Sequence, residues 1–398
     1  MSAEPAIIRT GADLERLARS VAASPIVALD AEGNGLFAYR ARLCTLQLGW
    51  QEGADPRIAI VDALEVDCRI LADVLGPTGP VKVLHDFTFD VKLLADAGVV
   101  LSNLRDTSVL ARMLGRKATG LASLLSSELG IVVEKELQQH DWSQRPLGVK
   151  HIEYLAGDVR HLLALYDKLT ELARAVDIEE EVLAESAFKY EMAIAPPREK
   201  RPAYLRIKGI DVLDPLGLAV LRRLVEERER IAEQWDVPPF KVAGNDLLLI
   251  LARARPTTTE ELGRVRRGMS SRLMGVSARI LSAVVSGLAD GTVPAADLQA
   301  PPRPEKAVAV ARRAREKRLT AWRRKEAAQR GVDEQVVLPG HCLQDLLELD
   351  GSEVGEIAAI RGMGQKRYEL YGAALAVVLA TPPASETEAP AEPAESKP

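Results

Sequence analysis

Two acidic residues stand where carboxylates can do chemistry. Asp30 and Glu32 follow the short apolar run Ile26–Leu29, which is typical of a β-strand. Residues i and i+2 of a strand point to the same face, so the two carboxylates would repel each other unless a cation lies between them. Hard divalent ions such as Mg²⁺ prefer oxygen ligands. The pair indicates a candidate metal site, with a solvated strand end as the simpler alternative.

Two further acids and a tyrosine extend this set. Asp90 lies near the start of a helical stretch, where the helix dipole favours an acid in any case. Asp158 follows Tyr154 by four residues, which places both side chains on one helix face. Aspartate has poor helix propensity, which favours a functional role for Asp158 over a solvent-facing one. For Tyr154 the structural alternative is an aromatic side chain at the edge of the core.

The elements that must position these residues alternate between strand and helix over the first 180 residues. Strands are predicted over Ile26–Asp30, Leu43–Trp50, Ile58–Val61 and Val81–His85. Helices are predicted over Phe89–Ala97, Thr107–Leu114 and Leu121–Leu129, followed by one long helix from Val149 to Val176. Strands mixed with helices in this way predict an α/β domain.

The rest of the chain carries helical patterns. Asp214-Pro215 is a typical helix start, with an N-cap acid before a proline. Val242–Leu247 is similar in pattern to Leu338–Leu343, which indicates two copies of one helical unit. We expect an α/β domain over 1–195, a first helical bundle over 210–292, a second over 305–380, and a disordered Pro-, Ala- and Glu-rich tail over 381–398.

Charge is distributed unevenly along the 398 residues, whose net charge is −5. Residues 1–200 carry 22 basic and 30 acidic side chains, while residues 201–330 carry 26 basic and 15 acidic ones and form a net +11 segment. A dense basic helix is predicted over Lys306–Arg330. An acidic domain with a metal site beside a basic segment suits a polyanionic partner. Chance variation among solvated helix faces is the alternative.

Several classes of protein are disfavoured. The three cysteines, Cys44, Cys68 and Cys342, are widely spaced and form no CxxC pair, which argues against a disulfide framework and a zinc site. The longest apolar run, about Leu370–Ala380, is far shorter than the ~20 residues that span a bilayer. The N-terminus has no signal-peptide pattern. We therefore expect a cytoplasmic protein that does not bind membranes, and we see no sign of an obligate protein partner.

The acids and the tyrosine, in this order, resemble the DEDD exonuclease family in its tyrosine subtype. Val27–Glu32, Lys82–Asp90 and Tyr154–Asp158 are similar to its three motifs, and Asp141–Leu147 resembles the stretch before the third motif in ribonuclease D. The two helical units resemble the helicase-and-RNase-D C-terminal (HRDC) domain, which ribonuclease D carries twice. The resemblance covers residues from about 5 to 380.

This resemblance implies an RNase H-like α/β exonuclease domain with a mixed sheet, followed by two all-α helical bundles. The implied activity is 3′→5′ hydrolysis of RNA 3′ ends to nucleoside 5′-monophosphates, with precursor tRNA as substrate. Two divalent ions, Mg²⁺ or Mn²⁺, would be held by Asp30, Glu32, Asp90 and Asp158. Tyr154 would orient or help deprotonate the attacking water. The nucleic-acid path would be lined by His85, Gln139, Trp142 and Arg145.

Two other functions stay open from the residues. A DNA 3′→5′ exonuclease of the same superfamily is one, because recognition of a ribose 2′-OH has no readable motif here. A non-catalytic RNA-binding scaffold is the other, although the four acids and the tyrosine are all present. Metal-dependent nucleotide release from RNA and DNA discriminates among these functions.

Overall fold

The computed structural model describes residues 4–133, 137–196, 201–265, 268–298, 305–349 and 354–381. The chain forms two compact units. The first contains residues 1–107, 121–166 and 190–301, and the second contains residues 108–120, 167–189 and 302–398. The expected tail over 381–398 lies outside the described residues except for its first residue.

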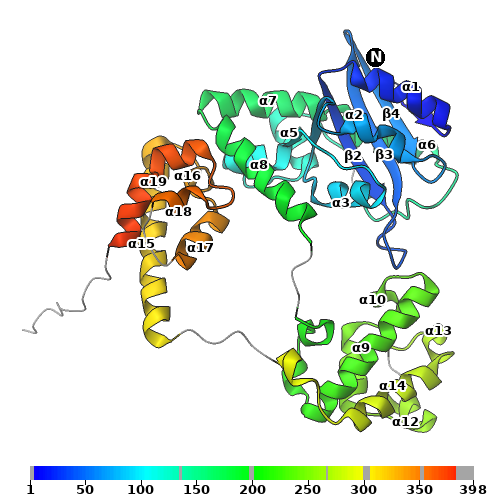
Figure 1. Cartoon of the computed structure of the whole chain (residues 1–398). Coiled ribbons are helices and arrows are strands. Elements are labelled where there is room, and N and C mark those ends of the chain that lie inside the picture. The colour runs from blue at the N-terminus through cyan, green and yellow to red at the C-terminus, as the bar shows by residue number, and fades with distance from the viewer. Residues whose placement is uncertain are drawn as a thin grey trace, which may run out of the picture. The chain divides into compact units, whose positions relative to one another are not determined.

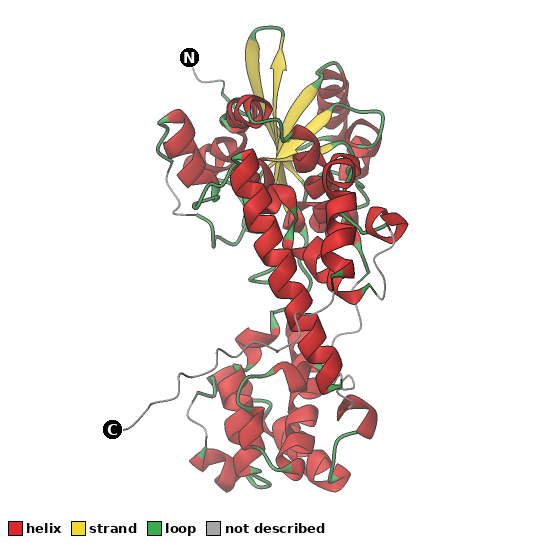
Figure 2. Ribbon diagram, turned by 90° about the vertical axis from the view of Figure 1, so that its left-hand side faces the viewer, coloured by secondary structure: helices red, strands yellow, loops and turns green. Residues whose placement is uncertain are grey.

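The first unit contains a six-stranded mixed sheet (Figures 1 and 2). Its strands are β1 (Ala6–Ile8), β2 (Ile26–Gly33), β3 (Leu43–Glu52), β4 (Asp55–Asp62), β5 (Val81–Leu84) and β6 (Leu104–Asp106), in the order β1-β4-β3-β2-β5-β6. The β2–β3 and β3–β4 pairs are antiparallel, while the β1–β4, β2–β5 and β5–β6 pairs are parallel. The predicted mixed α/β sheet of the RNase H-like type is confirmed.

The strand β2 lies inside this sheet, between β3 and β5. Val27, Ala28 and Leu29 are 0% exposed, because elements cover both faces of the sheet. Asp30 lies opposite Gln47 and Glu32 opposite Thr45 on β3, and the register shifts between Glu32 and Gly33. Asp30 and Glu32 follow the buried residues of β2, and their side chains point to the same face of the sheet, as strand alternation predicts.

Helices alternate with these strands along the chain and follow them. They are α1 (Gly11–Ala22), α2 (Ala72–Leu75), α3 (Thr88–Asp96), α4 (Thr107–Met113), α5 (Leu121–Leu129), α6 (Val149–Arg160), α7 (Leu162–Ala175) and α8 (Glu179–Ile194). The prediction of one long helix over 149–176 was wrong, because the chain turns at His161, whose N–H bonds to the Val159 carbonyl. Apolar spacings of three and four residues continue across such a one-residue break, so periodicity alone misses it.

The first helical bundle follows residue 214. Its helices are α9 (Pro215–Trp235), α10 (Pro239–Val242), α11 (Asn245–Ala254), α12 (Thr259–Arg264), α13 (Ser271–Met274) and α14 (Ser277–Asp290). Asp214 caps α9 as predicted, since its Oδ1 accepts a hydrogen bond from Gly217 N at 2.7 Å. A Cβ at Gly287 would lie 2.4 Å from Val220 Cα, so this glycine lets α14 cross closely over α9.

The second helical bundle belongs to the second unit. Its helices are α15 (Lys306–Arg330), α16 (Glu334–Val337), α17 (Gly340–Glu348), α18 (Val354–Ala358) and α19 (Gln365–Ala380). Leu319, Leu346, Ile357 and Leu375 are among the residues of its core. In the described parts of the chain no helix is long and apolar enough to cross a membrane.

Candidate active site

Three carboxylates converge where β2 meets α6. Asp30 and Glu32 come from β2 and Asp158 comes from α6, and one oxygen of each lies within 4.8 Å of the others. Asp90, from the first turn of α3, is 6% exposed and its Oδ1 accepts a hydrogen bond from Ala31 N at 3.1 Å. That bond places Asp90 beside β2, at the residue that separates the two strand acids in the sequence. Segments that are distant in the sequence thus bring all four predicted acids to one place.

A glycine on β3 determines how closely α6 approaches the sheet. A Cβ at Gly49 would lie 3.1 Å from the Val159 carbonyl oxygen and 3.3 Å from Val159 Cβ. Helix α6 therefore packs directly on the β3 backbone, one residue after Asp158. This contact gives Asp158 its position beside the acids of β2.

The acids share one buried, mutually repulsive environment. Burial and then the neighbouring Asp30 raise the pKa of Glu32 to about 9. Burial and then Asp90 raise the pKa of Asp158 to about 7. The pKa values of Asp30 and Asp90 are also raised, first by burial and second by a facing carboxylate. Negative charge at this site therefore requires a compensating cation.

The donor set fits divalent metal ions. It consists of carboxylate oxygens alone, which are the ligands that Mg²⁺ and Mn²⁺ prefer over softer groups. Binding a divalent ion would relieve the repulsion that raises these pKa values. Asp30, Glu32 and Asp158 thus form a candidate metal centre, with Asp90 beside it.

Tyr154 lies beside the acids, on the same helix as Asp158. Burial and then Asp158 raise the pKa of its hydroxyl, so Tyr154 is a neutral phenol at physiological pH. Its ring packs against the buried Trp142 with the ring centroids 5.6 Å apart. Trp142 in turn contacts His140 and His151, which stack on each other at 4.3 Å. This aromatic cluster holds the tyrosine beside the carboxylates.

Two of the residues expected along a nucleic-acid path, Trp142 and Arg145, make extensive contacts within the protein. Trp142 is 1% exposed and has no ring face available for a base. Arg145 donates to both oxygens of the buried Asp62 at 2.7 and 2.6 Å, and to the Cys44 carbonyl at 3.0 Å. These bonds tie the loop that carries Trp142 to β3 and β4. Both side chains make contacts within the protein, and their role toward nucleic acid stays a prediction.

The other two residues of that expected path have different surroundings. Gln139 is exposed in a turn. His85 is partly buried, and its Nδ1 lies 2.8 Å from Thr107 Oγ1. The Thr107 hydroxyl also lies 3.2 Å from the Leu84 carbonyl oxygen. Their role toward nucleic acid stays a prediction.

Sequence reasoning missed two residues that shape the site. Gly49 stands in an ordinary apolar strand pattern, and no local signal indicates the helix above it. Asn34 is 3% exposed and its Oδ1 accepts from Arg42 N at 2.9 Å, which fixes the turn after Glu32. The dipeptide Asn34-Gly35 is a turn signal, but the partner of the side chain is not readable from it.

The fold and the site define a 3′→5′ exonuclease followed by two HRDC domains. The model of a 3′-5′ exonuclease family matches residues 5–174, and the HRDC domain model matches residues 217–284 and 312–379. The resemblance between the two helical units is thereby confirmed.

Among similar proteins, ribonuclease D of Acidiphilium cryptum is 32% identical over 315 residues, which cover 76% of this chain and 77% of that protein. The crystal structure of Escherichia coli RNase D, an exoribonuclease involved in structured RNA processing, matches 94% of this chain and 98% of its own at 25% identity and a TM-score of 0.65. A protein from Bifidobacterium adolescentis shares the fold at 21% identity, with a TM-score of 0.76 over 95% of this chain and 97% of that one. The chain belongs to the ribonuclease D family and is a 3′→5′ exoribonuclease.

Proposed function

We propose that this enzyme trims the 3′ ends of structured RNA, precursor tRNA among them, by two-metal hydrolysis that releases nucleoside 5′-monophosphates. The observation that carries the proposal is the convergence of Asp30, Glu32 and Asp158, within 4.8 Å of one another, with Asp90 beside them. The Escherichia coli relative named above supports RNA as the substrate.

The residues have separate tasks in this proposal. Asp30, Glu32 and Asp158 would hold one divalent ion, while Asp30 and Asp90 would serve the second. When bound, the ions supply Lewis acidity to the scissile phosphate and lower the pKa of a water. The neutral hydroxyl of Tyr154 would form a hydrogen bond with the attacking water and orient it. His85 and Gln139 remain candidate contacts for the RNA.

Nucleotide release from end-labelled strands tests the proposal. RNA and DNA of one sequence are incubated with Mg²⁺, with Mn²⁺ or with EDTA, and products are separated by chromatography. Nucleoside 5′-monophosphates should appear from RNA in the presence of metal only. Preferential digestion of DNA would overturn the substrate assignment, and 3′-monophosphate products would overturn the hydrolytic geometry.

The variant Asp30→Asn tests the metal ligands in the same assay. Loss of an anionic ligand should remove metal and abolish release while the fold is kept. Asp55→Asn is the matched control, because Asp55 is an exposed strand residue outside the cluster. A well-folded Asp30→Asn enzyme with near wild-type turnover would refute the role of this residue. Precursor tRNA with additional 3′ nucleotides, compared with mature tRNA, then tests the substrate.

A further inference from the structure

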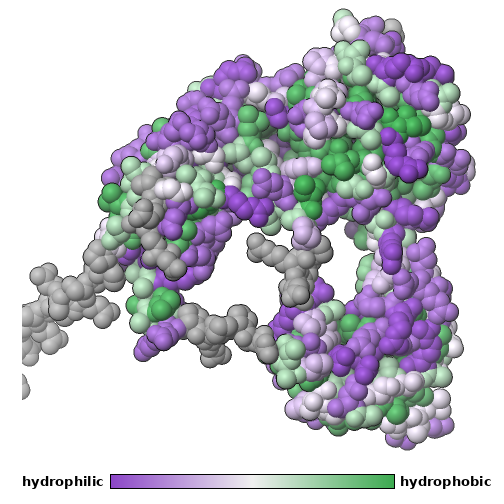
Figure 3. Space-filling view, in the orientation of Figure 1, coloured by the Kyte–Doolittle hydropathy of each residue, from purple (hydrophilic) through white to green (hydrophobic). Residues whose placement is uncertain are grey.

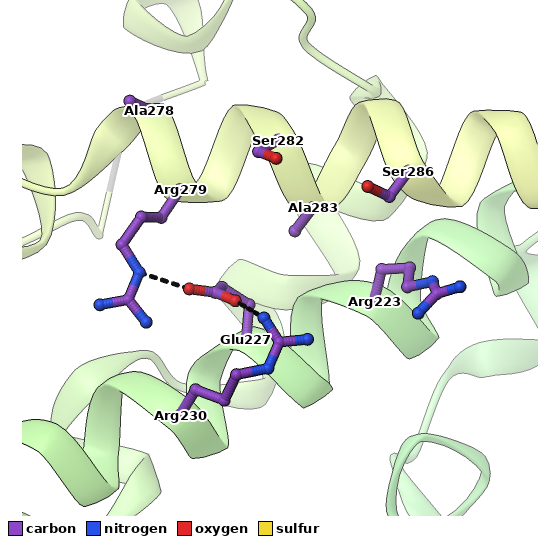
Figure 4. A pocket seen from close by; sticks show the side chains of 8 residues that line it. All are labelled: Arg223, Glu227, Arg230, Ala278, Arg279, Ser282, Ala283 and Ser286. Atoms are coloured by element: carbon purple, nitrogen blue, oxygen red, sulfur yellow. Dashed lines mark hydrogen bonds and ion pairs between the residues drawn. The ribbon is translucent and has the colours of Figure 1, made fainter.

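The crossing of α9 and α14 in the first HRDC domain encloses a polar hollow (Figure 4). Its cavity volume is about 360 Å³, within the roughly 300–1,000 Å³ that is typical of small-ligand sites. Arginines and serines supply most of the polar lining, which consists of Arg223, Glu227, Arg230, Arg279, Ser282 and Ser286. The close contact of Gly287 with Val220 brings the two helices together one residue after Ser286.

A single buried carboxylate organises two of the arginines. Glu227 on α9 has a side chain that is 7% exposed, and it pairs with Arg230 on its own helix and with Arg279 on α14. Two guanidinium groups close to each other would otherwise repel. By pairing with both, Glu227 holds the guanidinium groups of Arg230 and Arg279 close together at the rim of the hollow. Both arginine side chains are partly exposed and therefore accessible to a ligand.

The donors of the hollow are more numerous than its acceptors. A guanidinium carries five N–H donors, and Arg279 uses Nε for Glu227 and Nη1 for Gln234 at 2.6 Å. Arg223 is held by Asp290 at 2.6 Å and by Glu226 at 3.1 Å. Among the residues that the structure describes, the exposed hydroxyls of Ser282 and Ser286 have no hydrogen-bond partner. A ligand that suits this lining is an acceptor with negative charge.

We propose that this hollow is a phosphate-binding subsite that takes a backbone phosphate of bound RNA. The proposal rests on RNA being the substrate. Guanidinium groups bind phosphate oxygens with paired donors, and the serine hydroxyls add further donors. The face around α9 and α14 is largely hydrophilic (Figure 3), and it belongs to residues 201–300, which carry 15 basic and 12 acidic side chains. Contacts of this kind position a nucleic acid without reading its sequence.

The double variant Ser282→Asp, Ser286→Asp tests the subsite in the full-length enzyme. Both positions are exposed on α14, so the fold should be kept, and the new carboxylates would occupy the free arginine donors. Ser271→Asp is the matched control, because it makes the same change at an exposed serine of this domain outside the hollow. Arg230→Gln is a second variant, which leaves Arg279 as the partner of Glu227.

Binding of a fluorescent single-stranded RNA is measured in EDTA over a range of salt concentrations. Each lost phosphate contact should reduce the slope of log affinity against log salt by about 0.7. The double variant and Arg230→Gln should bind more weakly with shallower slopes, and Ser271→Asp should behave as wild type. Equal slopes in all proteins would overturn the subsite.

Two further measurements separate the possible failures. Titration with a nucleoside 5′-monophosphate shows whether the hollow instead takes the free product. The RNA assignment would be overturned if the wild type bound the nucleotide tightly, the double variant lost that binding, and RNA binding were the same in both. Metal-dependent hydrolysis of a short oligonucleotide should be the same in the double variant and the wild type. Absence of hydrolysis in the wild type would refute the proposed activity, whereas the binding measurements in EDTA test the hollow by themselves.

Discussion

At the scale of single residues, a change at Tyr154 should affect the rate of hydrolysis without affecting RNA binding. Its hydroxyl lies near three carboxylates and its ring rests on the buried Trp142. We predict that Tyr154→Phe lowers kcat by roughly 10²–10⁴-fold, the range of general acid–base catalysis, with RNA affinity retained. Steady-state kinetics and RNA binding in EDTA measure the two quantities. Tyr166→Phe on α7 is the control. A variant that keeps its rate and loses affinity would make Tyr154 a stacking residue.

The carboxylate cluster predicts how pH acts on the metal-free protein. Unfolded carboxyls have pKa values of about 4, while those of Asp158 and Glu32 are raised to about 7 and about 9 in the fold. Between these limits the folded state binds more protons than the unfolded chain, so its stability falls as pH rises through this window. Thermal unfolding in EDTA at several pH values measures the effect. Saturating Mg²⁺ should make the melting temperature less dependent on pH. Identical curves of melting temperature against pH with and without Mg²⁺ would contradict the prediction.

At the scale of elements, the packing of α6 against β3 controls the position of Asp158. We predict that Gly49→Ala moves α6 by a few tenths of an ångström, because its Cβ would lie 3.1 Å from the Val159 carbonyl oxygen. The rate should fall, by less than the roughly 10²-fold that a 1 Å misplacement costs. Gly157→Ala is the matched control, since a Cβ there meets nothing within 4 Å. Equal turnover of both variants would show that this contact does not position the acid.

The basic helix α15 is only partly the exposed cationic surface that its composition suggests. Arg323 pairs with Glu334 at 2.9 Å, and Arg315 donates to the Leu349 carbonyl at 2.8 Å, so both hold the second bundle together. Arg313, Lys317 and Arg324 are exposed and follow one side of the helix, and Arg324 also pairs with Glu334 at 3.3 Å.

We predict that changing Arg313, Lys317 and Arg324 to Gln weakens binding of single-stranded RNA. The salt slope should fall by up to about 0.7 for each phosphate contact that is lost. Fluorescence anisotropy at several salt concentrations measures it, and unchanged hydrolysis of a short oligonucleotide shows that the active site is intact. An unchanged slope would mean that these charges only solvate the helix.

At the scale of the whole molecule, residues 179–189 of α8 belong with the second bundle to one compact unit. The Glu181 carboxylate is fully buried and pairs with Arg330 at 2.6 Å and Lys366 at 3.3 Å. Arg367 is 0% exposed and donates to the Val336 carbonyl at 2.7 Å and the Glu181 carbonyl at 3.3 Å. Removing one partner of such an arrangement leaves uncompensated charge inside the protein.

We predict that Glu181→Gln destabilises this unit. Loss of one partner of a buried pair costs roughly 3–5 kcal/mol, and the cost should be smaller here because Arg330 and Lys366 keep 19% and 14% of their side chains exposed. Urea unfolding followed by circular dichroism measures the change. Glu180→Gln is the control, since Glu180 is the exposed neighbour on the same helix. Equal urea midpoints for the two variants would show that the ion pairs of Glu181 do not stabilise this unit.

The sequence by itself determined the chemistry of this protein. Strand alternation places Asp30 and Glu32 on one face, helical spacing does the same for Tyr154 and Asp158, and the order of the motifs indicates the family. The four main strands were readable from their apolar runs. Three-residue strands such as β1 and β6 were not, since they have too few positions for a periodic signal.

Only the tertiary structure decided which side chains meet. Trp142 and Arg145 resemble nucleic-acid contacts as residue types, yet one is buried beneath Tyr154 and the other is bound to Asp62. Gly49 and the hollow clamped by Glu227 depend on two elements that approach each other in space. Residue type and spacing specify what a side chain can do, but burial and pairing across distant segments arise when the chain packs.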